Sequence, residues 1–237
     1  MKNFSKRLAT VLVILSVVSG NLAVNQPRVE AMNLGDWARI FGVGNDLERS
    51  KQRMLKNFNY STALLTAAYE NVRIATDDTI ANKEIITQEQ ATRAALRTSD
   101  GGTRMRNGAE QNRRDAEHMR KYLSDALAAG DEEKLKRIDA FIETANNQRA
   151  LSDFMAGIAY TQIGLITVSK VTGALSGNGG EIEELIALTQ ETESLLRVRS
   201  ELSHLLKSVT AEYRLNRGIK EPSKEEQKST ADKIEKG

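Results

Sequence analysis

Two histidines in this chain each follow a carboxylate by three residues, which places the two side chains of each pair on one face of a helix. The pairs are Asp115 with His118 and Glu201 with His204. Bundle proteins that hold two iron ions use Glu-x-x-His on each of two helices and one further Glu from each of two others. The spacing therefore raises the hypothesis of a metal-dependent bundle enzyme.

The remaining ligands of such a site would come from Glu70 and Glu143. Metal ligands in helical bundles project into the interior, but the apolar patterns of the surrounding helices turn both histidines outward. His118 lies among charged residues, and His204 lies about half a turn from the apolar stripe that contains Leu202. We therefore expect two surface histidines, no catalytic residue, no metal ligand and no cofactor.

Other catalytic chemistry finds little support in the residue types. The chain has no cysteine, which excludes disulfides, thiol nucleophiles and lipid attachment at cysteine. The glycine-rich stretch 176–180 lacks the Lys-Ser or Lys-Thr of a phosphate-binding loop, and acidic residues follow it. Hydroxyl nucleophiles lack a base when both histidines face solvent. The sequence thus predicts a protein that is not an enzyme.

The first 31 residues have the layout of a cleaved export signal. A basic segment, 2–7, precedes an uncharged stretch, 8–24, and small residues stand at Val29 and Ala31, a pattern that signal peptidase accepts. The most apolar part is too short to cross about 30 Å of hydrocarbon. We therefore expect cleavage after Ala31 and a mature protein that is periplasmic, extracellular or associated with the cell envelope.

Removing this signal changes the charge of the protein. The whole chain carries +2, and its first 31 residues hold four basic side chains and one acidic side chain, so residues 32–237 carry −1.

The stretch 93–121 is basic, and it would suit an acidic partner or anionic lipid head groups, or else it is an ordinary charged helix face. Aromatic residues make up 5% of the chain, which leaves little material for base stacking. We expect no nucleic-acid partner.

Residues 45–216 have the composition of long helices. Both prolines, Pro27 and Pro222, lie outside this range, and no glycine or proline occurs between 46 and 99. This predicts an all-α fold, an elongated antiparallel bundle of about four to five helices. The first expected helix begins near Asp46, and the second occupies part of 78–97. The third follows a turn at 100–103, the fourth covers 132–175, and the fifth begins after residue 180.

Several expected helix ends carry specific signals. Thr87 and Gln90 have the spacing of a capping box. Gly130 stands where a helix ends in a left-handed residue, and Asp131 can cap the next helix. The short glycine-rich stretch 176–180 makes the two helices that flank it antiparallel neighbours. These signals fix the order of the long helices.

The most apolar stretch after the signal is 154–175, which is hydrophobic almost all round a helix. Its run of sixteen uncharged residues spans about 24 Å, less than the roughly 30 Å of a bilayer core. Gly157 and Gly164 fall on one side and form a notch that another helix could approach. We expect a buried core helix. The alternative is a segment that contacts or enters a membrane through Gly157, Ile163 and Gly164.

The two ends of the mature chain differ in character. Residues 32–44 form a short amphipathic segment in which Trp37, Ile40 and Phe41 share a face. This segment would bind a membrane interface or a partner, or else close the end of the bundle. Residues 217–237 are rich in Lys and Glu with few apolar side chains, which predicts a disordered tail.

These features favour an exported, non-enzymatic interaction or structural component of the cell envelope or of a secretion apparatus. A stripe near coiled-coil spacing over 185–213, interrupted by Thr192 and Arg199, would pair within the chain or between chains. We therefore expect protein partners or self-association, with a membrane surface as another candidate. The alternatives are a pore-forming-like protein that inserts 154–175 and, third, a metal-dependent bundle enzyme.

Overall fold

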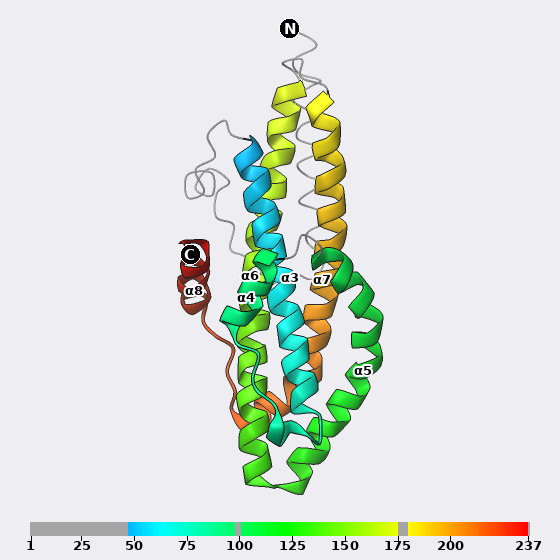
Figure 1. Ribbon diagram of the computed structural model, residues 1–237, viewed down its shortest axis with the longest axis vertical. Helices are drawn as coiled ribbons and strands as arrows, with labels where there is room; N and C mark the ends of the chain where they lie inside the picture. The colour runs from blue at the N-terminus through cyan, green and yellow to red at the C-terminus, as the bar shows by residue number, and fades with distance from the viewer. Residues whose placement is uncertain (1–46, 98–100, 175–179, 237) are drawn as a thin grey trace.

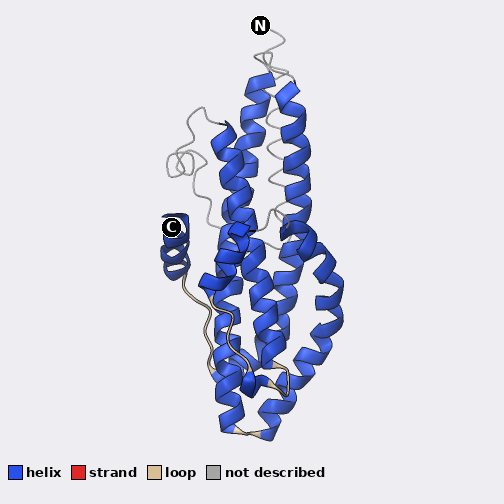
Figure 2. Cartoon of the chain, viewed as in Figure 1, coloured by secondary structure: helices blue, strands red, loops and turns tan. Residues whose placement is uncertain are grey.

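A computed structural model of the chain describes residues 47–97, 101–174 and 180–236 (Figure 1). This part is helical, without a strand among the described residues (Figure 2), which confirms the all-α prediction. The elements are α3 (Leu47–Ala75), η1 (Ile80–Asn82), α4 (Gln88–Arg97), α5 (Gly101–Ala129), α6 (Glu132–Ala174), α7 (Gly180–Arg217) and α8 (Lys224–Lys236).

The long helices α3, α6 and α7 lie side by side along an elongated bundle, with α6 running opposite to the other two (Figure 1). Helix α5 lies against α7 and runs parallel to it. Arg113 bonds Glu201 at 3.0 Å and Arg120 bonds Ser208 at 3.4 Å, and each partner is 88 residues later in the chain. The bundle is therefore not antiparallel throughout, because α3–α6, α5–α6 and α6–α7 are antiparallel neighbours but α5 and α7 are parallel.

The parallel pair arises because residues 76–87 carry the chain back along α3 before α4 and α5 begin (Figure 1). Two fully buried amides hold this return segment. The backbone N–H of Ile86 donates to Asn71 Oδ1 at 2.9 Å, and the Ile86 carbonyl accepts from Asn71 Nδ2 at 2.9 Å and from Gln148 Nε2 at 2.7 Å. These bonds satisfy backbone groups of the partly buried Ile86 that have no partner in a helix.

The predicted helix-end signals are confirmed. Gln90 Oε1 accepts from the Thr87 N–H at 2.8 Å and Thr87 Oγ1 accepts from the Gln90 N–H at 3.2 Å, the reciprocal bonds of a capping box. Gly130 has φ of 67°, and Asp131 Oδ1 caps the first turn of α6. The predicted turn at 100–103 is wrong in part, because α5 already begins at Gly101.

The apolar stripe of α6 lies inside the bundle, which confirms the core-helix prediction for the side chains described between 154 and 167. Met155, Ile163 and Ile166 are buried and belong to the apolar clusters. Gly157 is exposed, and a Cβ added at Gly157 or Gly164 would meet no neighbouring atom within 4 Å, so the predicted notch is open. Among the described helices, none has the length and apolar content to span a membrane.

The prediction of a disordered tail over 217–237 is not confirmed, because Lys224–Lys236 form α8. Ser223 and Glu226 bond each other's backbone N–H groups at the start of this helix, and Ala231 is 2% exposed. The composition did not predict this helix, because one small apolar contact and an ionic anchor order a segment whose other side chains are charged or polar.

Some predictions lie outside the described residues. These are the export signal over 1–31, the amphipathic segment 32–44 with Trp37, Ile40 and Phe41, and most of the glycine-rich turn at 176–180.

Candidate functional site

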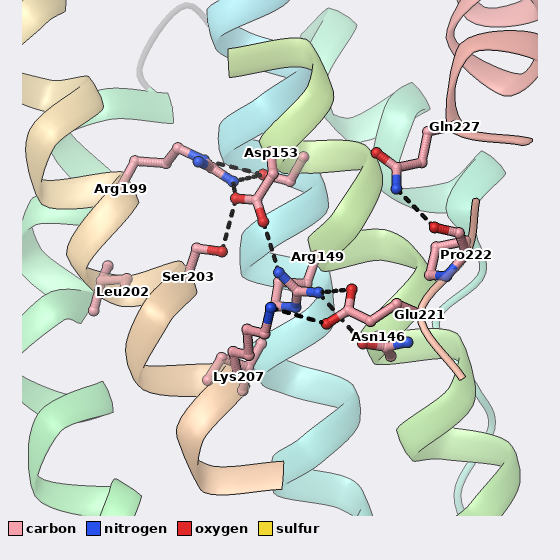
Figure 3. A network of polar contacts seen from close by, with 12 residues as sticks. Asn146, Arg149, Asp153, Arg199, Leu202, Ser203, Lys207, Glu221, Pro222 and Gln227 are labelled. Carbon is pink, nitrogen blue, oxygen red and sulfur yellow. Dashed lines mark hydrogen bonds and ion pairs between the residues drawn. The ribbon is translucent and has the colours of Figure 1, made fainter. Parts of the chain in front are cut away.

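Three arginines lie inside the bundle: Arg149 of α6 is 4% exposed, and Arg199 and Arg214 of α7 are 3% and 8% exposed. A buried guanidinium is costly unless carboxylates and other acceptors surround it. The contacts of these arginines form one connected polar network that joins α3, α6, α7 and the segment before α8. Figure 3 shows the part of it that links α6, α7 and that segment. We call it the arginine network.

At one end of the network Arg199 ties α7 to α6 and, through α6, to α3. Its Nε and Nη2 donate to Ser152 Oγ at 3.2 and 2.9 Å. Ser152 Oγ in turn donates to the Ser61 carbonyl, and Ser61 Oγ donates to the Ser152 carbonyl at 3.0 Å. The small serines let α3 and α6 approach closely, because neither side chain extends beyond its hydroxyl. Arg199 thereby reaches a polar contact at the centre of the bundle.

Asp153 is the acceptor at the middle of the network. It accepts from Arg199, from Arg149 Nη1 at 2.6 Å and from Ser203 Oγ at 2.7 Å (Figure 3). Burial raises the pKa of this carboxyl, but the guanidiniums of Arg199 and Arg149 outweigh the effect and hold the pKa below its usual range. Asp153 is therefore ionised at neutral pH and cannot serve as a proton donor there.

Glu221 is the acceptor at the other end, in the segment between α7 and α8. Its carboxylate is bonded by Arg149 Nη2, by Arg214 Nη1 at 3.1 Å and by Lys207 Nζ at 3.3 Å. Burial raises its pKa, but the charges of Arg149, Lys207 and Arg214 outweigh this and lower it. Asn146 Nδ2 also donates to the Lys220 carbonyl at 2.9 Å, so the backbone beside Glu221 is held as well.

Positive charge exceeds negative charge in this network. The cations are Arg149, Arg199, Lys207 and Arg214, and the carboxylates are Asp153 and Glu221. Arg214 Nε is buried and has no hydrogen-bond partner. The arrangement is suited to binding carboxylates, and it lacks a carboxyl held near neutral pKa that could exchange protons with a substrate.

The structure does not bring together the residues considered for a metal site. Arg73 bonds Asp115 at 3.1 Å and Glu70 at 3.3 Å, and Arg113 bonds Glu201 at 3.0 Å. These carboxylates therefore neutralise arginines, two of them across a helix contact. Over the described ranges, no group of three or more possible metal ligands is close enough to share an ion.

Both histidines lie on the surface, as predicted. His118 of α5 is exposed and its ring centroid lies 6.4 Å from that of Tyr122, and His204 of α7 is exposed. Glu143 is exposed on α6.

The sequence-based reasoning missed the arginine network, and it singled out Gly157, Ile163 and Gly164 on α6 instead. One signal was present, because Arg199 interrupts the apolar stripe of α7. An arginine within such a stripe demands a buried acceptor.

No protein-family model, curated protein or solved structure matches the chain.

Proposed function

We propose that the chain is an exported, non-enzymatic helical-bundle protein that acts as an interaction or structural component of the cell envelope or of a secretion apparatus. The arginine network is the observation that carries this proposal. Its charges join four parts of the same chain, which is what a scaffold needs in order to present long helices in a fixed arrangement. Charged groups used in this way rigidify a bundle and specify its packing.

Recognition would then take place on outward faces of the helices. On α5, Arg114, Glu117 and Lys121 are exposed and follow one another at helical spacing. Mixed charge of this kind favours specificity and fast association with a complementary protein surface.

Export is tested by fractionating cells that produce the full chain with a C-terminal tag. We expect the protein in the exported fraction, with a new N-terminus at Met32 found by mass spectrometry. A full-length chain in the cytosolic fraction would contradict the proposal.

Interaction is tested by placing a photo-crosslinking amino acid at Arg114 or Lys121 in the producing cell. We expect discrete crosslinked products that contain an envelope protein or a second copy of the chain. The same amino acid at Lys228 of α8, an exposed position on a different face, is the control for non-specific capture. Identical products from both faces, or none from α5, would count against recognition by α5.

The second candidate is a membrane-active protein that inserts 154–175. The open, uncharged surface at Gly157 and Gly164 favours it, since small residues allow helices to associate in lipid. Co-sedimentation with anionic vesicles, together with dye release, tests it. Insertion would be supported if the wild-type protein causes leakage and a folded Ile163→Asp variant does not. If the monodisperse protein does not bind the vesicles, insertion is excluded.

A further inference from the structure

Residues 218–236 form a strap that leaves the end of α7 and returns along α6 (Figure 1). The strap begins at Gly218, whose φ of 69° turns the chain out of α7, and the Ile219 N–H donates to the Arg214 carbonyl at 2.9 Å. Glu221 follows, and then α8. We call these residues the C-terminal strap.

Helix α8 makes a small apolar contact with the rest of the protein. Among its described side chains Ala231 alone is buried, and Ile234 is partly buried beside it. Both belong to an apolar cluster with residues of α3, α4 and α6, which include Tyr60, Leu64 and Met155. An isolated helix of 13 residues is marginally stable in water. The packing of two side chains, Ala231 and Ile234, therefore stabilises the docked position of α8 only weakly.

The stronger hold on the strap is the carboxylate of Glu221. Arg149, Arg214 and Lys207 converge on it, and Asn146 binds the preceding carbonyl. Both arginines belong to the long helices of the bundle, and each is buried in the folded chain. Without Glu221, Arg149 would keep Asp153 as a partner, but Arg214 would lose the carboxylate that it bonds, and the excess of positive charge there would be unfavourable. Arg214 Nε, buried and without a partner, adds a donor that the strap leaves unused.

We propose that Arg149, Arg214, Lys207 and Asn146, with the apolar cluster that Ala231 and Ile234 contact, form a binding site for a helical peptide that carries a carboxylate. The chain's own strap occupies this site in the resting protein. The ligand class follows from what the strap presents: a carboxylate, a small residue ten positions later and an aliphatic residue three positions after that, as at Glu221, Ala231 and Ile234. A partner segment with this pattern displaces the strap and releases α8.

The first test is hydrogen exchange of the full chain with Glu221→Gln, followed by mass spectrometry. We expect the amides of α8 to exchange at least about tenfold faster than in the wild-type chain, because the loss of a buried ion pair partner weakens the strap. The amides of α3 and α6 should still exchange far more slowly than those of α8, which shows that the bundle is folded. Asp232→Asn, which neutralises an exposed carboxylate of α8 itself, is the matched control and should leave the exchange of α8 unchanged. Unchanged α8 exchange in Glu221→Gln would overturn the proposal.

The second test uses a fluorescent peptide with the sequence of residues 219–236 and measures its anisotropy. We expect it to bind the Glu221→Gln chain more tightly than the wild-type chain, whose own strap competes. A peptide with the same Glu221→Gln change should bind at least about tenfold more weakly, because it lacks the carboxylate. Equal binding of the two peptides would contradict a carboxylate site.

If the Glu221→Gln chain proves unfolded, Ala231→Glu serves as the recipient. This change removes the apolar contact of α8 and leaves the arginines and Glu221 intact. Because Glu221 still competes for the arginines in this chain, both peptides are added in large excess. The wild-type peptide should then speed hydrogen exchange of α8 and the Glu221→Gln peptide should not, and equal effects of the two peptides would overturn the site.

Discussion

The guanidinium of Arg149 in α6 binds the carboxylate of Glu221, which lies 72 residues later in the chain. The same guanidinium also binds Asp153 at 2.6 Å, so one buried side chain couples the α6–α7 contact to the C-terminal strap (Figure 3). Stability of the bundle and attachment of α8 should therefore respond together to changes in this network.

Replacing Arg199 by methionine should lower the free energy of unfolding by about 3 kcal/mol, because it removes the α7 guanidinium that neutralises Asp153. Urea denaturation followed by circular dichroism measures the change. Arg197→Met is the matched control two residues away. Arg197 is exposed, with its ion pair to Glu193 on the surface, and its loss should leave the midpoint nearly unchanged. Equal effects of the two changes would contradict a buried role for Arg199.

Stability should fall in acid through Asp153 and Glu221. Their pKa values in the folded protein lie below the ordinary values of 3.8 and 4.5, so near those values the unfolded chain binds more protons than the folded one. Their contribution is thus complete above about pH 5 and is lost as pH drops through the lower folded-state pKa values. Urea midpoints between pH 3 and 7 test this. A double variant, Asp153→Asn with Glu221→Gln, should show a shallower acid slope, and an unchanged slope would contradict the assignment.

Asn71→Ala should lower the free energy of unfolding by about 2 kcal/mol, because the Ile86 N–H loses its acceptor. The same change should speed hydrogen exchange at Ile86. Asn216→Ala removes an exposed amide that bonds the Glu212 carbonyl, and it should change the free energy by less than about 0.5 kcal/mol. If both variants behaved alike, the return segment would be held by something other than Asn71.

Gly157→Ala should raise the free energy of unfolding by about 0.5 to 1 kcal/mol, because a methyl group there meets no neighbouring atom and alanine favours helix. Gly130→Ala should do the opposite and cost about 1 kcal/mol, since Gly130 has φ of 67°. Thermal or urea unfolding of the two variants compares the signs. A destabilising Gly157→Ala would mean that another chain packs closely on this face.

Local signals predicted the helices well. The capping box at Thr87 and Gln90, the left-handed Gly130 and the cap at Asp131 depend on bonds within a few residues, and the sequence displays them directly. The α6 helix accordingly ends within one residue of its predicted bounds, at Glu132–Ala174.

Long-range features could not be read from the same signals. The direction of α5 depends on how Asn71 and Gln148 hold Ile86, and these partners are 15 and 62 residues from it. The C-terminal strap is held by Glu221, which bonds Arg149 and Arg214. The residue type alone does not distinguish these buried arginines from arginines on the surface. The periodicity of apolar residues shows that a side chain faces the interior, but it does not show which hydrogen-bond acceptor lies next to that side chain.

The central claim is that the buried charges hold this bundle together. A double-mutant cycle between Arg149→Met and Glu221→Gln tests it most directly, with urea denaturation of the wild-type chain, both single variants and the double variant. We predict a coupling free energy of about 1 to 2 kcal/mol, reduced from that of a fully buried pair because the Glu221 side chain is 38% exposed. Additive effects of the two changes would contradict the account, because they would mean that Arg149 and Glu221 stabilise the protein independently.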